Sequence, residues 1–218
     1  CSVRRQRQMC IRDRFYAKQF ENDANADIHE KTTAIEILND FKELGLDYWV
    51  SGYGTGGTFS GVSRVLKEQS PKTKLVITEP DNAQLVSSLI AQKRNQDGSP
   101  ASAHDSWNPH QIQGWTPDFI PLVLQESIDK KYFDLNIPVS GEDGIYWSHQ
   151  LARNEGIITG ISGGSTFAVA MKIAEKAEDG ANILCMLADT AERYLTSVLF
   201  EMIDSEMNDE ENEILNSI

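Results

Sequence analysis

The residues with the clearest potential for chemistry form a glycine-rich loop that follows an apolar run. Residues 48–61 read YWVSGYGTGGTFSG, so glycine and threonine replace large apolar side chains within a few positions. Glycine lets the backbone approach a ligand closely. Successive N–H groups that open a helix bind phosphate, because the helix dipole adds positive charge there. The loop therefore predicts a phosphate-binding site.

Two kinds of phosphate ligand fit this loop. Gly52, Gly54 and Gly57 match the dinucleotide fingerprint G-x-G-x-x-G, and Glu79 follows where a ribose-binding carboxylate belongs. The run 54–58 instead forms a compact cradle for a terminal monophosphate, to which two threonine hydroxyls add donors. The loop by itself leaves both readings open.

The elements around the loop alternate between strand and helix. Short apolar runs predict strands at 47–53, 74–80, 132–140, 156–162 and 181–187. Apolar residues at helical spacing predict helices at 28–44, 58–69, 82–94, 140–156, 163–179 and 191–203, with Ser140 as an N-cap. This alternation predicts an α/β fold, a parallel twisted sheet with helices on both faces.

Composition limits the partners. The formal net charge of −13 argues against nucleic acid and anionic membranes, since both bind basic surfaces. No apolar run approaches the roughly 18 residues of a membrane span. Three cysteines without short metal-type spacing predict neither a disulfide framework nor a metal site, and they fit a cytoplasmic location. Cys185, within NILCML, is predicted to be a buried thiol.

The chain divides into three predicted segments. Residues 1–14 contain five arginines and no apolar periodicity, and we interpret them as non-native or disordered. Residues 15–204 are predicted to form the α/β domain. Residues 205–218 lack lysine and arginine and are predicted to be a solvated acidic tail.

Five sequence blocks occur in a fixed order between residues 19 and 195. They are Gln19-Phe20-Glu21-Asn22 with Ala24-Asn25, Ile28-His29 and Thr32-Thr33; Gly54-Thr55-Gly56-Gly57-Thr58 with Gly61; His110-Gln111-Ile112-Gln113-Gly114 with Phe119-Ile120-Pro121; Gly160-Ile161-Ser162-Gly163-Gly164; and Asp189-Thr190-Ala191-Glu192-Arg193-Tyr194-Leu195. Together they resemble the cysteine synthase (O-acetylserine sulfhydrylase) family of pyridoxal-phosphate enzymes. The resemblance implies fold type II, with a large C-terminal domain and a remnant of the smaller N-terminal domain.

The resemblance implies pyridoxal 5′-phosphate as the cofactor. The positions that match its phosphate loop are Gly54, Thr55, Gly56, Gly57 and Thr58. Ser162 matches the residue that hydrogen-bonds the pyridine nitrogen, and a serine at a helix start also serves as an N-cap. A hydroxyl does not hold that nitrogen protonated as a carboxylate does, which favours expulsion of a β-substituent over transamination.

The implied reaction is β-replacement, in which O-acetylserine and sulfide give cysteine, in an enzyme that is usually a homodimer. Gln19 and Gly114 match positions near the amino-acid substrate. His29 and His110 lie in structural blocks and are predicted to serve packing or capping, and Glu79 becomes a strand-end carboxylate under this reading.

The resemblance also identifies a missing catalytic residue. The family's Schiff-base lysine lies in an S-x-K-D-R-type segment far upstream of the phosphate loop, and no such lysine occurs here. Arg12 lies in a superficially similar stretch, but an arginine cannot form the Schiff base. We therefore expect the chain to be a fragment, roughly the C-terminal two-thirds of such an enzyme, and inactive alone.

At three places the sequence departs from the family pattern, and these departures bear more on the substrate than on the cofactor. Ala188 replaces a usual proline and Gly163 a common serine, whereas Trp115-Thr116-Pro117-Asp118 replaces smaller residues and is expected to alter the mouth of the site.

Three alternatives remain, namely a cystathionine β-synthase-like enzyme, a non-catalytic partner-binding protein and a nicotinamide-binding oxidoreductase.

Overall fold

The centre of the molecule is a four-stranded sheet in the order β3-β2-β1-β4. The computed structural model describes residues 16–202, 204 and 206–217, so the segment interpreted above as non-native lies outside it. The strands are β1 (Tyr48–Gly52), β2 (Lys74–Pro80), β3 (Leu135–Val139) and β4 (Ile183–Cys185). Every pairing is parallel, which confirms the predicted α/β class.

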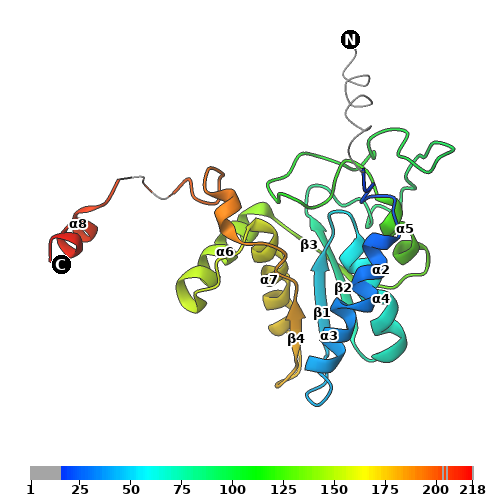
Figure 1. The fold of residues 1–218 in the computed structure, drawn as a ribbon, viewed down its shortest axis with the longest axis horizontal. Coiled ribbons are helices and arrows are strands. Elements are labelled where there is room, and N and C mark those ends of the chain that lie inside the picture. Colours follow the sequence, from blue (N-terminus) through cyan, green and yellow to red (C-terminus); the bar gives the residue numbers. More distant parts are fainter. Residues whose placement is uncertain (1–15, 203, 205, 218) are drawn as a thin grey trace, which may run out of the picture.

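Helices cover both faces of this sheet (Figure 1). They are α2 (Ala24–Lys31), α3 (Thr33–Asp40), α4 (Gly57–Gln69), α5 (Leu122–Asp129), α6 (Gly141–Glu155), α7 (Ile161–Ala174), a 3-10 helix η2 (Ala191–Tyr194) and α8 (Asp209–Asn216). Helices α2, α3 and α4 lie on one side of the sheet, and α6 and α7 lie on the other (Figure 1).

The alternation of side chains along the strands explains the two layers. Trp49 and Leu75 are paired in register and point into the core formed with α3 and α4. The next pair, Val50 and Val76, points to the opposite face and packs with α7. Successive strand residues face opposite sides, so both faces of a sheet this apolar have to be covered by helices.

The strand order reverses at β1, which creates a ligand-binding position at the carboxyl ends of β1 and β4. The chain passes from β1 through β2 to β3 on one side, whereas β4 pairs with the other side of β1. Ligands bind outside the carboxyl ends of strands where the order reverses in this way. That position lies between the loops that follow β1 and β4.

Capping residues define both ends of α6, the helix that precedes α7. The Ser140 side chain accepts a hydrogen bond from the Asp143 amide at 3.0 Å, which confirms the predicted N-cap of α6. Gly156 ends α6 in the left-handed conformation with φ +69°. Helix α6 then packs against α7.

The predicted helix at 82–94 is wrong, and the cause is a buried carboxylate. The amides of Val86 and Ser87 donate to the Glu79 side chain at 2.6 and 3.1 Å, so they are not free for helical bonds. Leu89 also has a φ of +58°, which no α-helix contains. A hydrogen bond to the end of the preceding strand, which apolar periodicity does not encode, therefore overrides that periodicity.

Other elements differ from their predictions. The single helix predicted at 28–44 is replaced by α2, which begins earlier at Ala24, and α3, which ends at Asp40, because Thr32 has φ −122° and ψ −77° between them. The predicted strand at 156–162 provides only an isolated bridge between Thr159 and Thr190. The predicted helix at 191–203 is limited to η2, and α5 was not predicted. The acidic segment contains α8, whose capping box joins Asn208 and Glu211 and which buries none of its residues.

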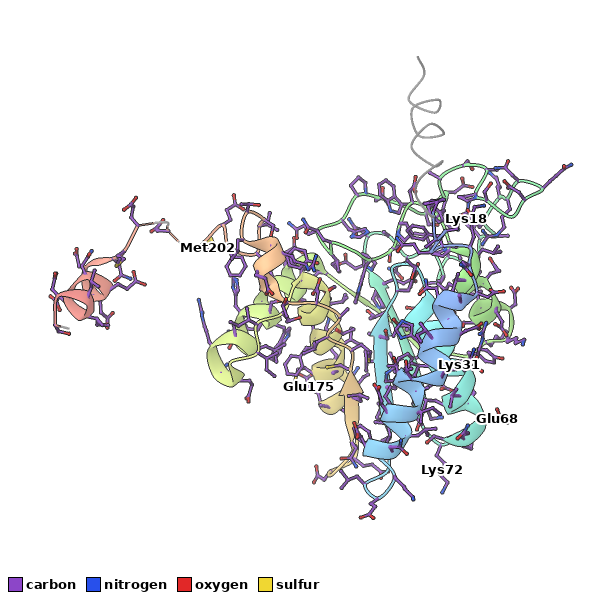
Figure 2. All side chains as sticks on the ribbon, in the orientation of Figure 1. Lys18, Lys31, Glu68, Lys72, Glu175 and Met202 are labelled. Atoms are coloured by element: carbon purple, nitrogen blue, oxygen red, sulfur yellow. The ribbon has the colours of Figure 1, made fainter. Side chains whose placement is uncertain are left out.

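Charged side chains project from the outer surface of the helical layer. Lys31 of α2 and Glu68 of α4 are exposed on the helical side of the sheet, and Lys72 is exposed in the turn between α4 and β2 (Figure 2). Among the helices of the described residues, none has both the length and the apolar character that crossing a bilayer demands.

Candidate functional site

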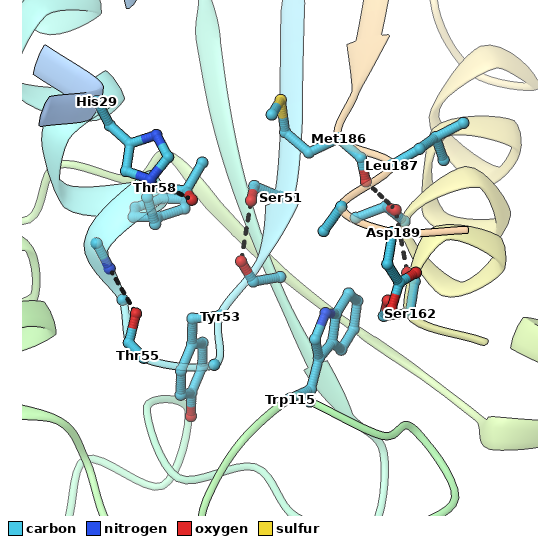
Figure 3. Close-up of a pocket in the computed structure, with 18 of the residues that line it drawn as sticks. His29, Ser51, Tyr53, Thr55, Thr58, Trp115, Ser162, Met186, Leu187 and Asp189 are labelled. Atoms are coloured by element: carbon cyan, nitrogen blue, oxygen red, sulfur yellow. Dashed lines mark hydrogen bonds between the residues drawn. The ribbon is translucent and has the colours of Figure 1, made fainter. Parts of the chain in front are cut away.

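A cavity of about 380 Å³ lies at the carboxyl ends of β1 and β4. One wall is the glycine-rich loop after β1 and the start of α4, and the opposite wall is the start of α7 with the residues that follow β4. Figure 3 shows Thr55 and Thr58 on one side of this cavity and Ser162 and Asp189 on the other. The structure thus brings the predicted phosphate loop and Ser162 to one cavity.

The phosphate loop presents unpaired amides to this cavity. Gly56 adopts the left-handed conformation with φ +87° and is followed directly by the first residue of α4. Within the described part of the chain, the amides of Thr55, Gly56 and Thr58 donate to no other group. Unpaired amides at a helix N-terminus attract an anion. This wall therefore has the geometry of a phosphate cradle.

Glycine is required in the cradle because its neighbours leave no room for a side chain. A Cβ at Gly54 would lie 2.2 Å from the carbonyl oxygen of Gly114. A Cβ at Gly57 would lie 2.1 Å from Oδ1 of Asn25. Gly114 itself has a φ of +83° and lines the cavity. The sequence separation of these contacts explains why the loop alone did not identify them.

Side chains from α2 hold the two threonine hydroxyls of the cradle. The Asn25 amide donates to Thr55 Oγ1 at 2.8 Å. Nε2 of His29 lies 3.2 Å from Thr58 Oγ1 (Figure 3). Burial lowers the pKa of His29 below its ordinary value of 6.5, so this imidazole is neutral near neutral pH. His29 was predicted to serve packing or capping, and the structure places it in the cavity wall.

Ser162 supplies the uncharged polar group of the opposite wall. It is the second residue of α7, whose N-cap is Gly160, so Ser162 is not the cap. It is 5% exposed, and its hydroxyl has no hydrogen-bond partner among the described residues. Asp189 stabilises this wall, because its carboxylate accepts from the Gly160 amide at 3.3 Å and from the Tyr194 hydroxyl. Partial burial, together with the hydrogen bond to Asp189, raises the pKa of Tyr194 to about 12.

Trp115, the first residue of the unusual sequence after Gly114, forms part of the cavity wall. Its indole packs so closely against β1 that a Cβ at Gly52 would lie 2.1 Å from the ring. Figure 3 shows Trp115 between Tyr53 and Ser162. The next residue, Thr116, is buried with φ +36°, a conformation that a β-branched residue rarely adopts. A bulky aromatic side chain therefore faces the space beside the cradle.

Glu79 does not fit the dinucleotide reading. It is fully buried and accepts hydrogen bonds from the Tyr53 hydroxyl at 2.8 Å and the Asn136 amide at 2.8 Å. It also accepts from Val86 and from both donors of Ser87. Burial and this carboxylate raise the pKa of Tyr53. A carboxylate with all its acceptor sites occupied cannot bind a ribose, so Glu79 is structural.

The remaining sequence candidates lie in different surroundings. Gln19 is exposed, its backbone carbonyl accepts from Asn25 at 2.7 Å, and its side chain does not line the cavity, so its substrate role stays a prediction. His110 Nε2 lies 3.1 Å from the Thr116 carbonyl and serves the loop structure. Burial raises the pKa of the Cys185 thiol to about 11, which keeps it protonated.

Asn25 was the functional candidate that sequence reasoning missed. The block Asn25 to Thr33 was recognised only as part of a resemblance, and nothing in it predicted contact with a loop some thirty positions away. The signal that could have identified it is the spacing of Asn25 and His29, since residues i and i+4 share one helix face.

The donors on the two walls fit pyridoxal phosphate. The amides of Thr55, Gly56 and Thr58, which have no partner among the described residues, suit a phosphate dianion together with the two threonine hydroxyls. The unpaired Ser162 hydroxyl on the facing wall suits an uncharged ring nitrogen. Among the described residues, no lysine lines the cavity. The arrangement can therefore bind and orient such a group but offers no amine to link it covalently.

The chain is similar to known proteins in sequence and structure. The sequence profile of the family described as "Pyridoxal-phosphate dependent enzyme" matches residues 3–189. An O-ureido-L-serine synthase of Streptomyces lavendulae is 41% identical over 195 residues, 89% of this chain and 54% of that protein. Cysteine synthase B of Campylobacter jejuni is 42% identical over 186 residues, 85% of this chain and 54% of that protein.

A solved structure shares the fold. The crystal structure of an O-ureido-L-serine synthase matches with a TM-score of 0.80 and 38% identity, and the match covers 95% of this chain and 60% of that one. The chain spans about half the length of the relatives it matches, less than the two-thirds expected from the resemblance.

Proposed function

This chain belongs to the family of pyridoxal-phosphate dependent enzymes, and from that premise we propose that the protein carrying it makes cysteine from O-acetylserine and sulfide by β-replacement. The observation that carries the proposal is the cavity in which the free amides of 54–58 face the unpaired hydroxyl of Ser162. The similarity to a cysteine synthase B supports the choice of reaction.

Each wall has a separate part in the proposed reaction. Pyridoxal phosphate, when bound, supplies the electron sink for bond breaking at the substrate's α-carbon. The cradle at 54–58 would bind its phosphate and fix its position, since positioning is a main contribution of the protein in cofactor enzymes. Ser162 would hydrogen-bond the ring nitrogen without placing a charge beside it, which would favour loss of the β-substituent over transamination.

A second candidate function differs from the first only in the nucleophile. Cysteine and O-ureido-L-serine differ only in the group on the β-carbon, and this chain is similar to a synthase of each. Hydroxyurea is the compound whose oxygen would give the second product. Trp115 stands beside the cradle, where it would limit the size of the incoming group.

A product assay separates these functions. The protein from the complete gene is loaded with pyridoxal phosphate and given O-acetylserine with sulfide, homocysteine or hydroxyurea, while acetate release and products are measured by mass spectrometry. We expect acetate release and cysteine as the fastest product. A faster homocysteine or hydroxyurea reaction would replace cysteine synthesis by the corresponding alternative. Without acetate release from the cofactor-loaded protein, β-replacement of O-acetylserine is refuted.

Two further expectations accompany the proposal. Because no lysine lines the cavity among the described residues, we expect this chain alone to bind the cofactor without turnover. The expected homodimer is a separate proposal, and light scattering of the protein from the complete gene will give its oligomeric state.

A further inference from the structure

Two glycines of α4 allow α2 to lie unusually close to the cradle. A Cβ at Gly61 would lie 2.2 Å from the carbonyl oxygen of Ala26, and a Cβ at Gly57 would meet Asn25. Asn25 and His29 are four residues apart and therefore face the same way along α2. The close approach brings both polar side chains to the threonines of the cradle.

The direction of the Asn25 hydrogen bond follows from its second partner. Nδ2 of Asn25 lies 2.7 Å from the backbone carbonyl of Gln19, which only accepts, so this atom is the amide nitrogen. The same nitrogen lies 2.8 Å from Thr55 Oγ1 and must donate to it. The Gly57 amide also donates to Thr55 Oγ1, at 3.4 Å. With its oxygen accepting twice, Thr55 keeps its hydroxyl proton for a ligand in the cavity.

His29 forms a chain of hydrogen bonds that can run in either of two directions. Its Nδ1 lies 2.9 Å from Thr33 Oγ1, and its Nε2 lies 3.2 Å from Thr58 Oγ1. A neutral imidazole donates from one nitrogen and accepts at the other. If Nε2 carries the proton, Thr33 donates to Nδ1 and Thr58 keeps its hydroxyl proton. If Nδ1 carries the proton, Thr58 has to donate to Nε2 and presents only lone pairs to the cavity.

An anion in the cradle selects between the two directions. A phosphate is stabilised by O–H and N–H donors and repelled by lone pairs. The free amides around Thr58 already direct donors to the same space. Only the direction from Thr33 through His29 to Thr58 adds a hydroxyl donor to them.

We infer that Asn25 and His29 are positioning residues that orient the hydroxyl protons of Thr55 and Thr58 toward the cofactor phosphate, with Thr33 donating to Nδ1 of His29. The inference rests on the proposed cofactor site. None of the three positioning side chains has to touch the reacting atoms. Their effect is confined to the phosphate end of the cofactor.

The tautomer of His29 is the most direct readout. The protein from the complete gene is labelled with ¹⁵N-histidine, loaded with pyridoxal phosphate, and compared with its His29→Gln variant to assign the imidazole resonances. We expect Nε2 of His29 to carry the proton and Nδ1 to be an unprotonated acceptor. A proton on Nδ1 with a bare Nε2 would overturn the inference.

The hydrogen-bond chain through His29 can also be tested by mutation, with the affinity of each variant for two forms of the cofactor as the measurement. Thr33→Val removes the donor to Nδ1. Thr32→Val is the matched control, because among the described residues the Thr32 hydroxyl bonds only the Ile28 carbonyl. Apparent dissociation constants are measured for pyridoxal 5′-phosphate and for pyridoxal, which lacks the phosphate. We expect Thr33→Val to weaken binding of the phosphorylated form about threefold and His29→Phe about tenfold. Pyridoxal binding and the Thr32→Val control should not change.

The outcomes separate this inference from the proposed function. If the wild-type protein binds neither form of the cofactor, the proposed site itself fails. If it binds pyridoxal 5′-phosphate but Thr33→Val and His29→Phe affect both forms equally, the positioning role is wrong and the cofactor site stands. Partial recovery by His29→Gln, which retains an N–H donor, is the further expected result.

Discussion

Replacement of Gly56 by alanine is a severe test of the cradle. Gly56 has a φ of +87° and precedes the first residue of α4. A Cβ there would lie 2.7 Å from Leu124 Cβ and 3.1 Å from the Leu124 backbone. Gly45→Ala is the matched control, because Gly45 has a similar φ of +74° but nothing within 4 Å of its Cβ position.

The magnitudes follow from these two sites. A left-handed conformation costs an alanine about 1–2 kcal/mol at either position. The clash with Leu124 adds an overpacking cost of about 1–3 kcal/mol at Gly56 alone. We therefore expect Gly56→Ala to reduce the free energy of unfolding by about 2–5 kcal/mol and Gly45→Ala by about 1–2 kcal/mol. Moving the loop away from Leu124 also displaces the cradle amides.

Urea unfolding of the cofactor-free protein from the complete gene measures the stability term, and titration with pyridoxal 5′-phosphate measures the cradle. We expect Gly56→Ala to lose at least about tenfold in affinity, since about 1.4 kcal/mol of lost interaction is enough. Gly45→Ala should keep wild-type affinity. Equal losses of stability and affinity in both variants would show that the cradle geometry has been misassigned.

Three further predictions concern other parts of the site. Gly52→Ala should lower stability by about 1–3 kcal/mol through its clash with the Trp115 indole, and adding Trp115→Ala should recover part of that loss; strictly additive urea midpoints would contradict the contact. The folded pKa of His29 is below 6.5, so the folded state binds fewer protons and stability should fall as pH is lowered below 6.5; a His29→Gln variant with the same pH dependence would exclude this cause. With a pKa raised from 9.0 to about 11, Cys185 should react with iodoacetamide about 100-fold more slowly at neutral pH than in urea-unfolded protein; equal rates would mean that the thiol is not protected.

The sequence predicted the parts of the fold that depend on local patterns. The run 48–52 and the helix after Gly56 are defined by nearby residues, and the structure contains both close to their expected bounds. Ser140 caps α6 because its side chain bonds an amide only three residues away. Alternation of such elements was enough to predict a parallel sheet with helices on both faces.

The wrong predictions come from contacts that local sequence patterns do not encode. The helix expected at 82–94 is absent from the described structure because Glu79 captures the amides of Val86 and Ser87. No local pattern specifies that contact. Glu79 also gave the dinucleotide reading its apparent support, although its carboxylate is buried and fully bonded.

The candidate site shows the same division. The cradle glycines were predicted from their spacing and from a family resemblance, and the structure places them in a cavity with Ser162. The roles of Asn25 and His29 could not be predicted, because they depend on how closely α2 packs on α4.

The most direct test of the central claim is a crystal structure of the protein from the complete gene with pyridoxal phosphate bound. We predict that the phosphate lies within hydrogen-bond distance of the amides of Thr55, Gly56 and Thr58 at the start of α4. The ring nitrogen should face the Ser162 hydroxyl on the opposite wall. A phosphate bound elsewhere, or a ring nitrogen directed away from Ser162, would contradict the account.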